Sequence, residues 1–328
     1  MIDVLENINK QINKEFTYNS GYKYSANLHN NDYYKLLISR VAEDKTKDYG
    51  IDSVYFLWLE DLSILHFEYA IYANIKLKDD TLAKEHILKS SQYGYMCLEY
   101  GSQSCGCFEG KNPFIVQNKA TFMMSNLLLV NNIAHFTSVA NHLINSLNSK
   151  SCIIKKGYKD STISWFILKL YSISSKEDIT LHKLLQPKDT KPYKEVLDNW
   201  DTKDINEVSK YIELLCDAHI IQAKFNYEIY QEEINDGDVF GLKYKELFCI
   251  GTYALPFEVL FLLQIRKLNN LENPNEFNHP LMNTGITKLY LNLENKPMQY
   301  ELKEANELIK KLKDNCKNFE KSTKGKDK

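Results

Sequence analysis

The scarcity of residues that interrupt helices is the feature that most constrains the fold of this chain. Glycine and proline contribute only 12 and 7 of the 328 residues. Apolar residues recur every three or four positions over long segments, whereas the period-two alternation that indicates strands is rare. The sequence therefore predicts an all-α protein, an irregular multi-helix bundle of antiparallel helical hairpins.

The clearest interruption of the helical pattern is Gly101–Gly110, which contains three glycines. It leads into Asn112 and Pro113, a pair that can cap and start a helix. This break predicts three parts: an N-terminal helical region over 1–105, a C-terminal helical domain over 111–318 and a disordered charged tail over 319–328.

Composition limits the functions open to the chain. A formal net charge of −2 provides no global positive field for holding nucleic acid or an anionic membrane. Arginine, which usually recognises phosphate through two parallel hydrogen bonds, occurs only at Arg40 and Arg266. We therefore expect neither a nucleic-acid partner nor a membrane partner, and phosphate-handling enzymes are disfavoured.

Seven cysteines, an odd number in a chain long enough to fold without disulfides, predict reduced thiols. The most apolar stretch, 54–75, contains several charged residues that a membrane span would not carry in a row. The first residues lack the apolar segment of a secretory signal. Together these features predict a cytoplasmic protein.

No motif for a cofactor or a metal stands out. The usual signatures of phosphate loops, dinucleotide sites, zinc proteases and serine hydrolases are absent. Cys105 and Cys107 form a C-x-C pair that could bind a metal, but without further ligands at zinc spacing two free thiols are the simpler interpretation. We therefore predict no metal, no cofactor and no catalytic residue.

The most informative histidine is His219, which lies on a helical stripe that enters the predicted core. The stripe contains Val208, Ile212 and Leu215 before His219, and Gln222 and Asn226 after it. Buried polar groups need partners, so we expect His219 to bond a backbone carbonyl or an acidic side chain from the helix that begins at Pro256. The alternative, His219 as a general base, lacks a recognisable nucleophile.

Pro256 at a first helical position, with Glu258 two residues later, indicates the start of that helix, since an acid is favoured at the positive end of the helix dipole. Arg266 follows two turns after Glu258. It is predicted to be a structural anchor that reaches an acid on a neighbouring helix.

An acidic run just beyond His219 predicts a negative patch. It comprises Glu228, Glu232, Glu233, Asp236 and Asp238. Such a patch can attract a basic partner, with Tyr227 and Tyr230 as aromatic anchors beside it. The alternative is a solvated turn after a helix that ends at Tyr230.

The C-terminal third resembles a known family in the order of its short motifs. These are Leu215-Cys216-Asp217-Ala218-His219-Ile220, an acidic turn ending in Val239-Phe240, Leu255-Pro256-Phe257-Glu258-Val259-Leu260, Gln264-Ile265-Arg266-Lys267-Leu268 and His279-Pro280-Leu281. Over about 204–282 the order is similar to that of helical immunity proteins of bacterial polymorphic toxin systems, the PoNi-type and immunity protein 49 group. The signature residues are Asp217, His219, Pro256, Glu258, Arg266, His279 and Pro280.

The resemblance implies an immunity protein for interbacterial competition, including type VI secretion, and not an enzyme. Such a protein binds a cognate toxin domain, often a nuclease and therefore expected to be basic, and occludes its active site. Two alternatives stay open. One is a helical scaffold or adaptor that binds peptides or proteins in a groove. The other is a metal-dependent helical-bundle enzyme that uses Glu60, His66, Glu68 and His135.

Overall fold

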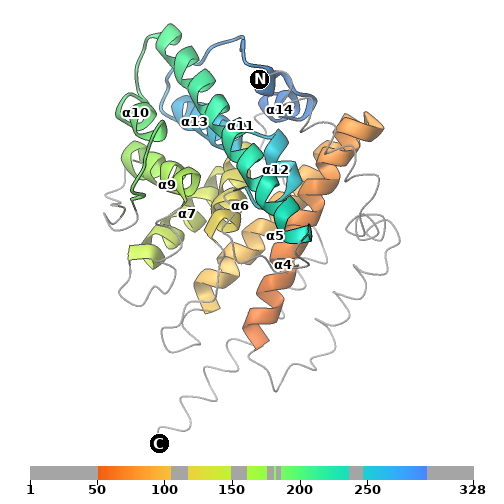
Figure 1. Ribbon diagram of the computed structural model, residues 1–328. Helices are drawn as coiled ribbons and strands as arrows, with labels where there is room; N and C mark the ends of the chain where they lie inside the picture. Colours follow the sequence, from red (N-terminus) through yellow and green to blue (C-terminus); the bar gives the residue numbers. More distant parts are fainter. Residues whose placement is uncertain are drawn as a thin grey trace, which may run out of the picture.

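The structure is a computed structural model that describes residues 51–104, 117–148, 161–175, 181, 186–235 and 247–293. Every regular element within these residues is a helix (Figure 1), which confirms the predicted all-α class. The tail over 319–328 and the C-x-C pair lie outside the described residues.

The helices are of three types. The α-helices are α4 (Ile51–Tyr72), α5 (Asp80–Ser104), α6 (Gln117–Leu129), α7 (Ile133–Asn148), α9 (Thr162–Ser174), α10 (Tyr193–Asp198), α11 (Ile205–Asn235), α12 (Ile250–Ala254), α13 (Phe257–Leu268) and α14 (Gly285–Leu291). A π-helix, η1 (Ala73–Leu77), extends α4, and a 3-10 helix, η3 (Pro280–Asn283), precedes α14.

Helices α4 and α5 form a hairpin and pack along one another more extensively than any other described pair. Both helices contribute buried side chains, and α4 carries apolar residues around its whole circumference, as expected of a helix covered by neighbours. The chain reverses at Lys78, whose left-handed backbone (φ 55°) ends η1. Asp79 Oδ1 then accepts a hydrogen bond from the N–H of Leu82 at 2.8 Å and caps the start of α5.

Helix α6 occupies the middle of the bundle, where it contacts α5, α7, α9 and α13. It is joined to α7 by a tight turn in which Asn131 adopts a left-handed backbone (φ 60°). Ser161 accepts a hydrogen bond from the N–H of Ser164 and thereby caps α9. Helix α11 runs diagonally across this assembly in Figure 1 and packs on α12 and α13.

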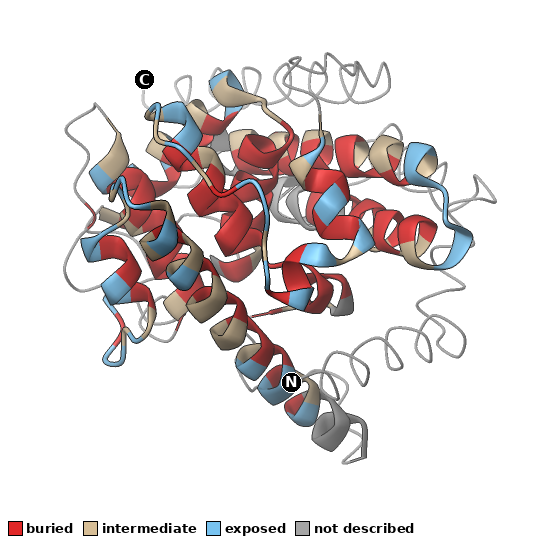
Figure 2. Cartoon of the chain, turned by 90° about the horizontal axis from the view of Figure 1, so that it is seen from above, coloured by how far each residue is buried: buried red, intermediate tan, exposed pale blue. Residues whose placement is uncertain are grey.

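The buried side chains form one hydrophobic cluster with members from α4 through α14. Contacts between aromatic rings connect the helices: Phe122 of α6 lies 4.6 Å from Phe67 of α4 and 5.5 Å from Phe257 of α13, measured between ring centroids. Figure 2 shows the buried residues on the inner sides of the helices and the exposed ones on the outside. The described helices on either side of the expected boundary near residue 105 therefore share a core.

Candidate functional site

His219 and Glu258 form a completely buried polar pair between α11 and α13. Nδ1 of His219 lies 2.7 Å from Oε1 of Glu258, and Nε2 lies 3.0 Å from the carbonyl oxygen of Thr252. Both side chains have 0% exposure. A carbonyl oxygen can only accept, so Nε2 carries a hydrogen, and one further proton is shared between Nδ1 and the carboxyl group. The predicted partners of His219, an acid of the next helix and a backbone carbonyl, are confirmed.

The polar ladder continues from His219 along α11 toward the C-terminal end of the helix. Asn226, which is 0% exposed, donates from Nδ2 to the carbonyl oxygen of Leu247 at 3.1 Å. Gln222 donates to Oδ1 of Asn226 at 3.0 Å. These bonds fix the segment just before α12 against α11, and they satisfy the polar groups that the stripe brings into the core.

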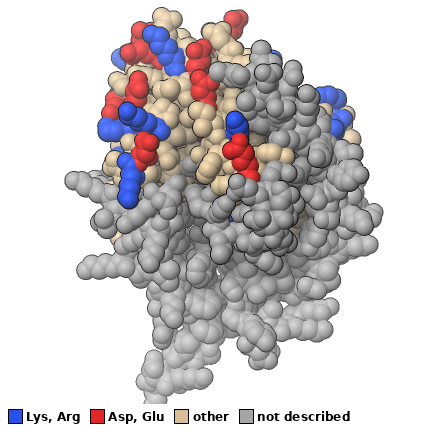
Figure 3. Space-filling model, viewed as in Figure 1, with Lys and Arg blue, Asp and Glu red and all other residues tan. Residues whose placement is uncertain are grey.

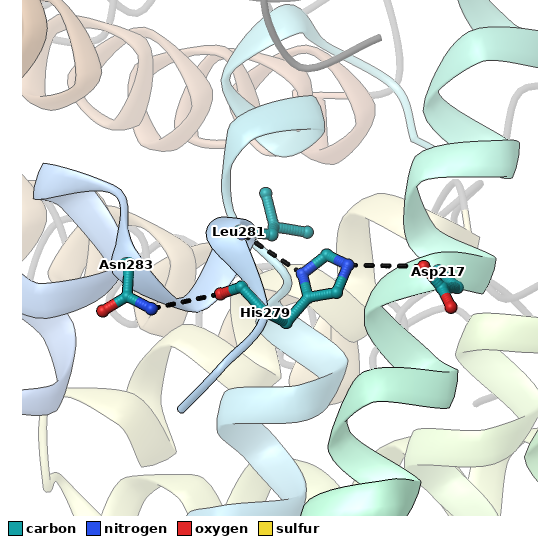
Figure 4. Close-up of polar contacts among 4 residues, drawn as sticks. All are labelled: Asp217, His279, Leu281 and Asn283. Atoms are coloured by element: carbon teal, nitrogen blue, oxygen red, sulfur yellow. Dashed lines mark hydrogen bonds and ion pairs between the residues drawn. The ribbon is translucent and has the colours of Figure 1, made fainter. Parts of the chain in front are cut away.

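A second histidine ties the segment before α14 to α11, as Figure 4 shows. Nδ1 of His279 accepts a hydrogen bond from the N–H of Leu281 at 3.2 Å, so Nε2 is the nitrogen that carries the hydrogen. Nε2 lies 3.3 Å from Oδ1 of Asp217. Pro280 occupies the first turn of η3, where its missing N–H costs nothing.

Arg266 is almost completely buried, with 1% exposure, and holds two loops against α13. Its guanidinium group donates to the carbonyl oxygens of Trp200, Thr202 and Glu272, and its Nε donates to Oδ1 of Asn273 at 3.1 Å. The predicted structural anchor is present. The expected partner was wrong, because the guanidinium group bonds backbone carbonyls and an amide, whereas an acidic side chain was expected.

All seven signature residues therefore lie in or next to the helices α11, α12, α13 and η3. Pro256 is the residue before the first turn of α13, one position earlier than predicted. Their hydrogen bonds connect helices and loops inside the protein, and the His219–Glu258 pair is closed off from solvent. This arrangement suits a rigid scaffold, and in this conformation a substrate could not reach the imidazole.

The four residues of the metal hypothesis are not brought together. Glu60 pairs with Lys119 of α6, His66 lies 2.9 Å from His86 between their Nδ1 atoms, and Nδ1 of His135 lies 2.8 Å from Nδ2 of Asn132. Burial raises the pKa of Glu60, and the positive charge of Lys119 only partly opposes this shift. In the segments that the structure describes, no group of three or more His, Cys, Asp or Glu side chains could hold a metal ion.

The predicted acidic patch is only partly described. Helix α11 continues to Asn235, so Glu232 and Glu233 lie in its last turns, and the predicted turn after Tyr230 is corrected. Asp236 and Asp238 lie outside the described residues, as does the side chain of Tyr230. Glu228 is exposed, with Nζ of Lys224 at 4.0 Å. Tyr227 is partly buried and packs against the core, so it is not a freely exposed anchor.

The structure reveals a surface that the sequence patterns did not indicate. Asp217, Ile221, Lys224, Phe225 and Glu228 recur at helical spacing along the side of α11 that faces away from the core; we call them the outer face of α11. Ile221 is 70% exposed and Phe225 is 52% exposed. Their spacing of four residues, on a face otherwise made of polar residues, is the signal that could have identified them.

Charged groups surround this apolar pair. Asp217 lies one turn before Ile221, and Glu228 lies one turn after Lys224. Figure 3, which has the view of Figure 1, shows groups of neighbouring acidic and basic side chains with uncharged atoms between the groups. The outer face of α11 therefore combines an apolar centre with charged groups at its edges, the usual make-up of a protein contact surface.

Comparison with known proteins adds no assignment: no family model, curated protein or solved structure matches this chain. Among the described helices, none combines the length and the apolar character needed to cross a membrane.

Proposed function

We propose that the protein is an immunity protein that binds and neutralises a toxin domain, and that the toxin docks on the outer face of α11. The exposure of Ile221 and Phe225 carries this proposal. Two large apolar side chains side by side in a polar surround are costly to leave in water, and aromatic side chains often dominate the affinity of interfaces.

The charge of the surface favours a basic partner. Asp217 and Glu228 contribute two negative charges to the outer face of α11 and Lys224 contributes one positive charge. Lys210 is exposed two turns before Asp217, and two more acids, Glu232 and Glu233, lie near the end of the helix. Enzymes that cleave nucleic acids are generally basic where they hold phosphate. An inhibitor that covers such a site needs a complementary acidic surface and no catalytic group of its own.

The position of this surface also suits an inhibitor. The opposite side of α11 is anchored in the core by His219 and Asn226. Such anchoring keeps the exposed side in a fixed shape, which reduces the entropy lost when a partner binds. The scaffold alternative would instead hold its partner in a concave groove between helical pairs, whereas Ile221 and Phe225 are exposed on a single helix.

The proposal is tested with the full chain and the purified product of the neighbouring gene, whose toxicity is measured in cells with and without this protein. We expect tight binding by calorimetry and protection of the cells. The double variant Ile221→Ser/Phe225→Ser should weaken binding by about 100-fold, since two contact residues of this kind are lost. Its melting temperature should not fall, because both side chains are exposed.

A matched control is Leu268→Ser on α13, which alters another large hydrophobic residue with 44% exposure. It should bind the toxin like the unaltered protein. A neighbouring product that is not toxic, or an Ile221→Ser/Phe225→Ser variant that binds as tightly as the control, would contradict the proposal. The charge-reversal variant Glu228→Lys should mainly slow association, most strongly at low salt.

A further inference from the structure

A pocket of about 990 Å³ lies between the η1–α5 connection and α14. The residues that matter in its lining are Asn74, Lys78, Asp80, Lys84, Lys288 and Asn292. We call it the lysine pocket. Its volume is at the upper end of the range of sites that bind small molecules, roughly 300–1,000 Å³.

The three lysines of this pocket have no acidic partner in the described part of the chain. Four other lysines, Lys89, Lys119, Lys194 and Lys224, have a carboxylate oxygen within 4.0 Å. Among the described residues that line the lysine pocket the only acid is Asp80, and its Oδ1 accepts a hydrogen bond from Nδ2 of Asn74 at 2.8 Å. The pocket therefore carries an excess of positive charge.

The walls of the pocket have unusual backbone geometry. The π-helix η1 supplies Asn74, and Lys78 ends η1 in the left-handed region with its N–H bonded to the carbonyl oxygen of Ala73. A π-helical turn is uncommon and often occurs at functional sites, whereas a left-handed residue after a helix is a common helix end.

The two sides of the pocket are also held close together. A Cβ atom added to Gly285 would lie only 2.7 Å from Oδ1 of Asn74. Glycine at this position therefore lets the start of α14 approach η1, and Asn74 is only 7% exposed between them. The positions of Lys78 and Lys84 relative to Lys288 are set by this contact.

We propose that the lysine pocket binds a small phosphate-bearing anion of about the size of a nucleotide. Lysine ammonium groups recognise phosphate as point charges, and the side-chain amide of Asn292 lies in the same lining. Binding of this kind depends on the number of negative charges and weakens with salt. The site is separate from the outer face of α11, so this inference does not depend on the proposed function.

Pyrophosphate is the first test ligand, titrated into the full chain at low ionic strength by calorimetry, with ATP and sulfate in parallel. We expect saturable binding of pyrophosphate and ATP and much weaker binding of sulfate. Tighter binding of ATP would indicate a nucleotide ligand, and tighter binding of pyrophosphate a free phosphate compound. The triple variant Lys78→Gln/Lys84→Gln/Lys288→Gln should bind pyrophosphate at least about tenfold more weakly.

The matched control removes the same number of charges from exposed lysines elsewhere, Lys188→Gln/Lys203→Gln/Lys210→Gln. It should retain the affinity of the unaltered protein. The proposal is overturned if neither pyrophosphate nor ATP binds, if sulfate binds as tightly as they do, or if the control loses as much affinity as the pocket variant.

Discussion

Nδ1 of His219 lies 2.7 Å from Oε1 of Glu258 in a part of the core where neither side chain is exposed. Oε2 of Glu258 has no hydrogen-bond partner among the residues that the structure describes. The carboxyl group is therefore stabilised in the core by its contact with the imidazole, and the imidazole by its contacts with Glu258 and Thr252. Each side chain offsets the cost of burying the other.

Removing one member of this pair should destabilise the protein strongly. We expect His219→Ala to lower the free energy of unfolding by about 3–5 kcal/mol, because it leaves Glu258 buried without a partner. Glu258→Gln, whose side-chain amide can donate a hydrogen bond to Nδ1, should cost only about 1–3 kcal/mol. Urea denaturation measures both. Lys210→Ala on the exposed side of α11 is the control, and an equal effect of all three variants would refute the assignment.

Arg266 should tolerate no replacement. Arg266→Ala leaves the carbonyl oxygens of Trp200 and Thr202 without their donor and should cost about 3 kcal/mol or more. Arg266→Lys keeps the charge but lacks the planar group that reaches four acceptors, so it should recover less than half of that loss. Thermal unfolding of the two variants separates geometry from charge: full recovery by lysine would show that only the charge matters.

The stability of the protein should fall in mild acid partly because of His66. Burial, followed by the charges of His86 and Lys89, lowers the pKa of His66 well below its ordinary value of 6.5. Below pH 6.5 the unfolded chain takes up a proton that the folded protein does not, so acidification favours unfolding. The contribution of this group is at most about 1.4 kcal/mol per pH unit.

Denaturation curves at pH 7.5 and pH 5.5 test this expectation in the unaltered protein and in His66→Gln, which cannot titrate. The variant should lose less stability between the two pH values. Identical losses would show that other groups account for the acid sensitivity.

Gly251 should resist replacement by alanine. A Cβ atom at this position would lie 2.8 Å from Cε1 of the buried Phe67 ring. Although alanine favours a helix by about 1 kcal/mol over glycine, we expect Gly251→Ala to cost about 1–3 kcal/mol, because the ring is packed on all sides. Gly94→Ala, whose Cβ would lie 3.1 Å from Cβ and Cγ of Met123, is the matched comparison in thermal unfolding and should cost less, because this contact is less close.

The sequence predicted the parts of the structure that depend on periodic patterns. The all-α class follows from the spacing of apolar residues, and the burial of His219 follows from its place on the stripe with Ile212 and Leu215. A histidine on an apolar stripe must find a partner, and Glu258 was the acid at the start of the next helix. For these features, the local sequence pattern and the need of buried polar groups for hydrogen bonds were sufficient to predict the structure.

Other features depend on contacts between distant segments, which no local pattern records. The partners of Arg266 are backbone carbonyls of two loops, and any residue can provide a carbonyl. Helix α11 extends past the expected end because glutamates such as Glu232 and Glu233 are compatible with a helix. Ile221 and Phe225 were missed because an apolar residue in a helix is usually buried.

The two-sided character of α11 has a further consequence for how a partner would be captured. Since its inner side is bonded into the bundle through His219 and Asn226, the helix cannot leave its place without opening the bundle around it. A bound partner would therefore raise the melting temperature of the whole protein. The association rate would be set by collision and orientation, because α11 does not have to fold when the partner binds.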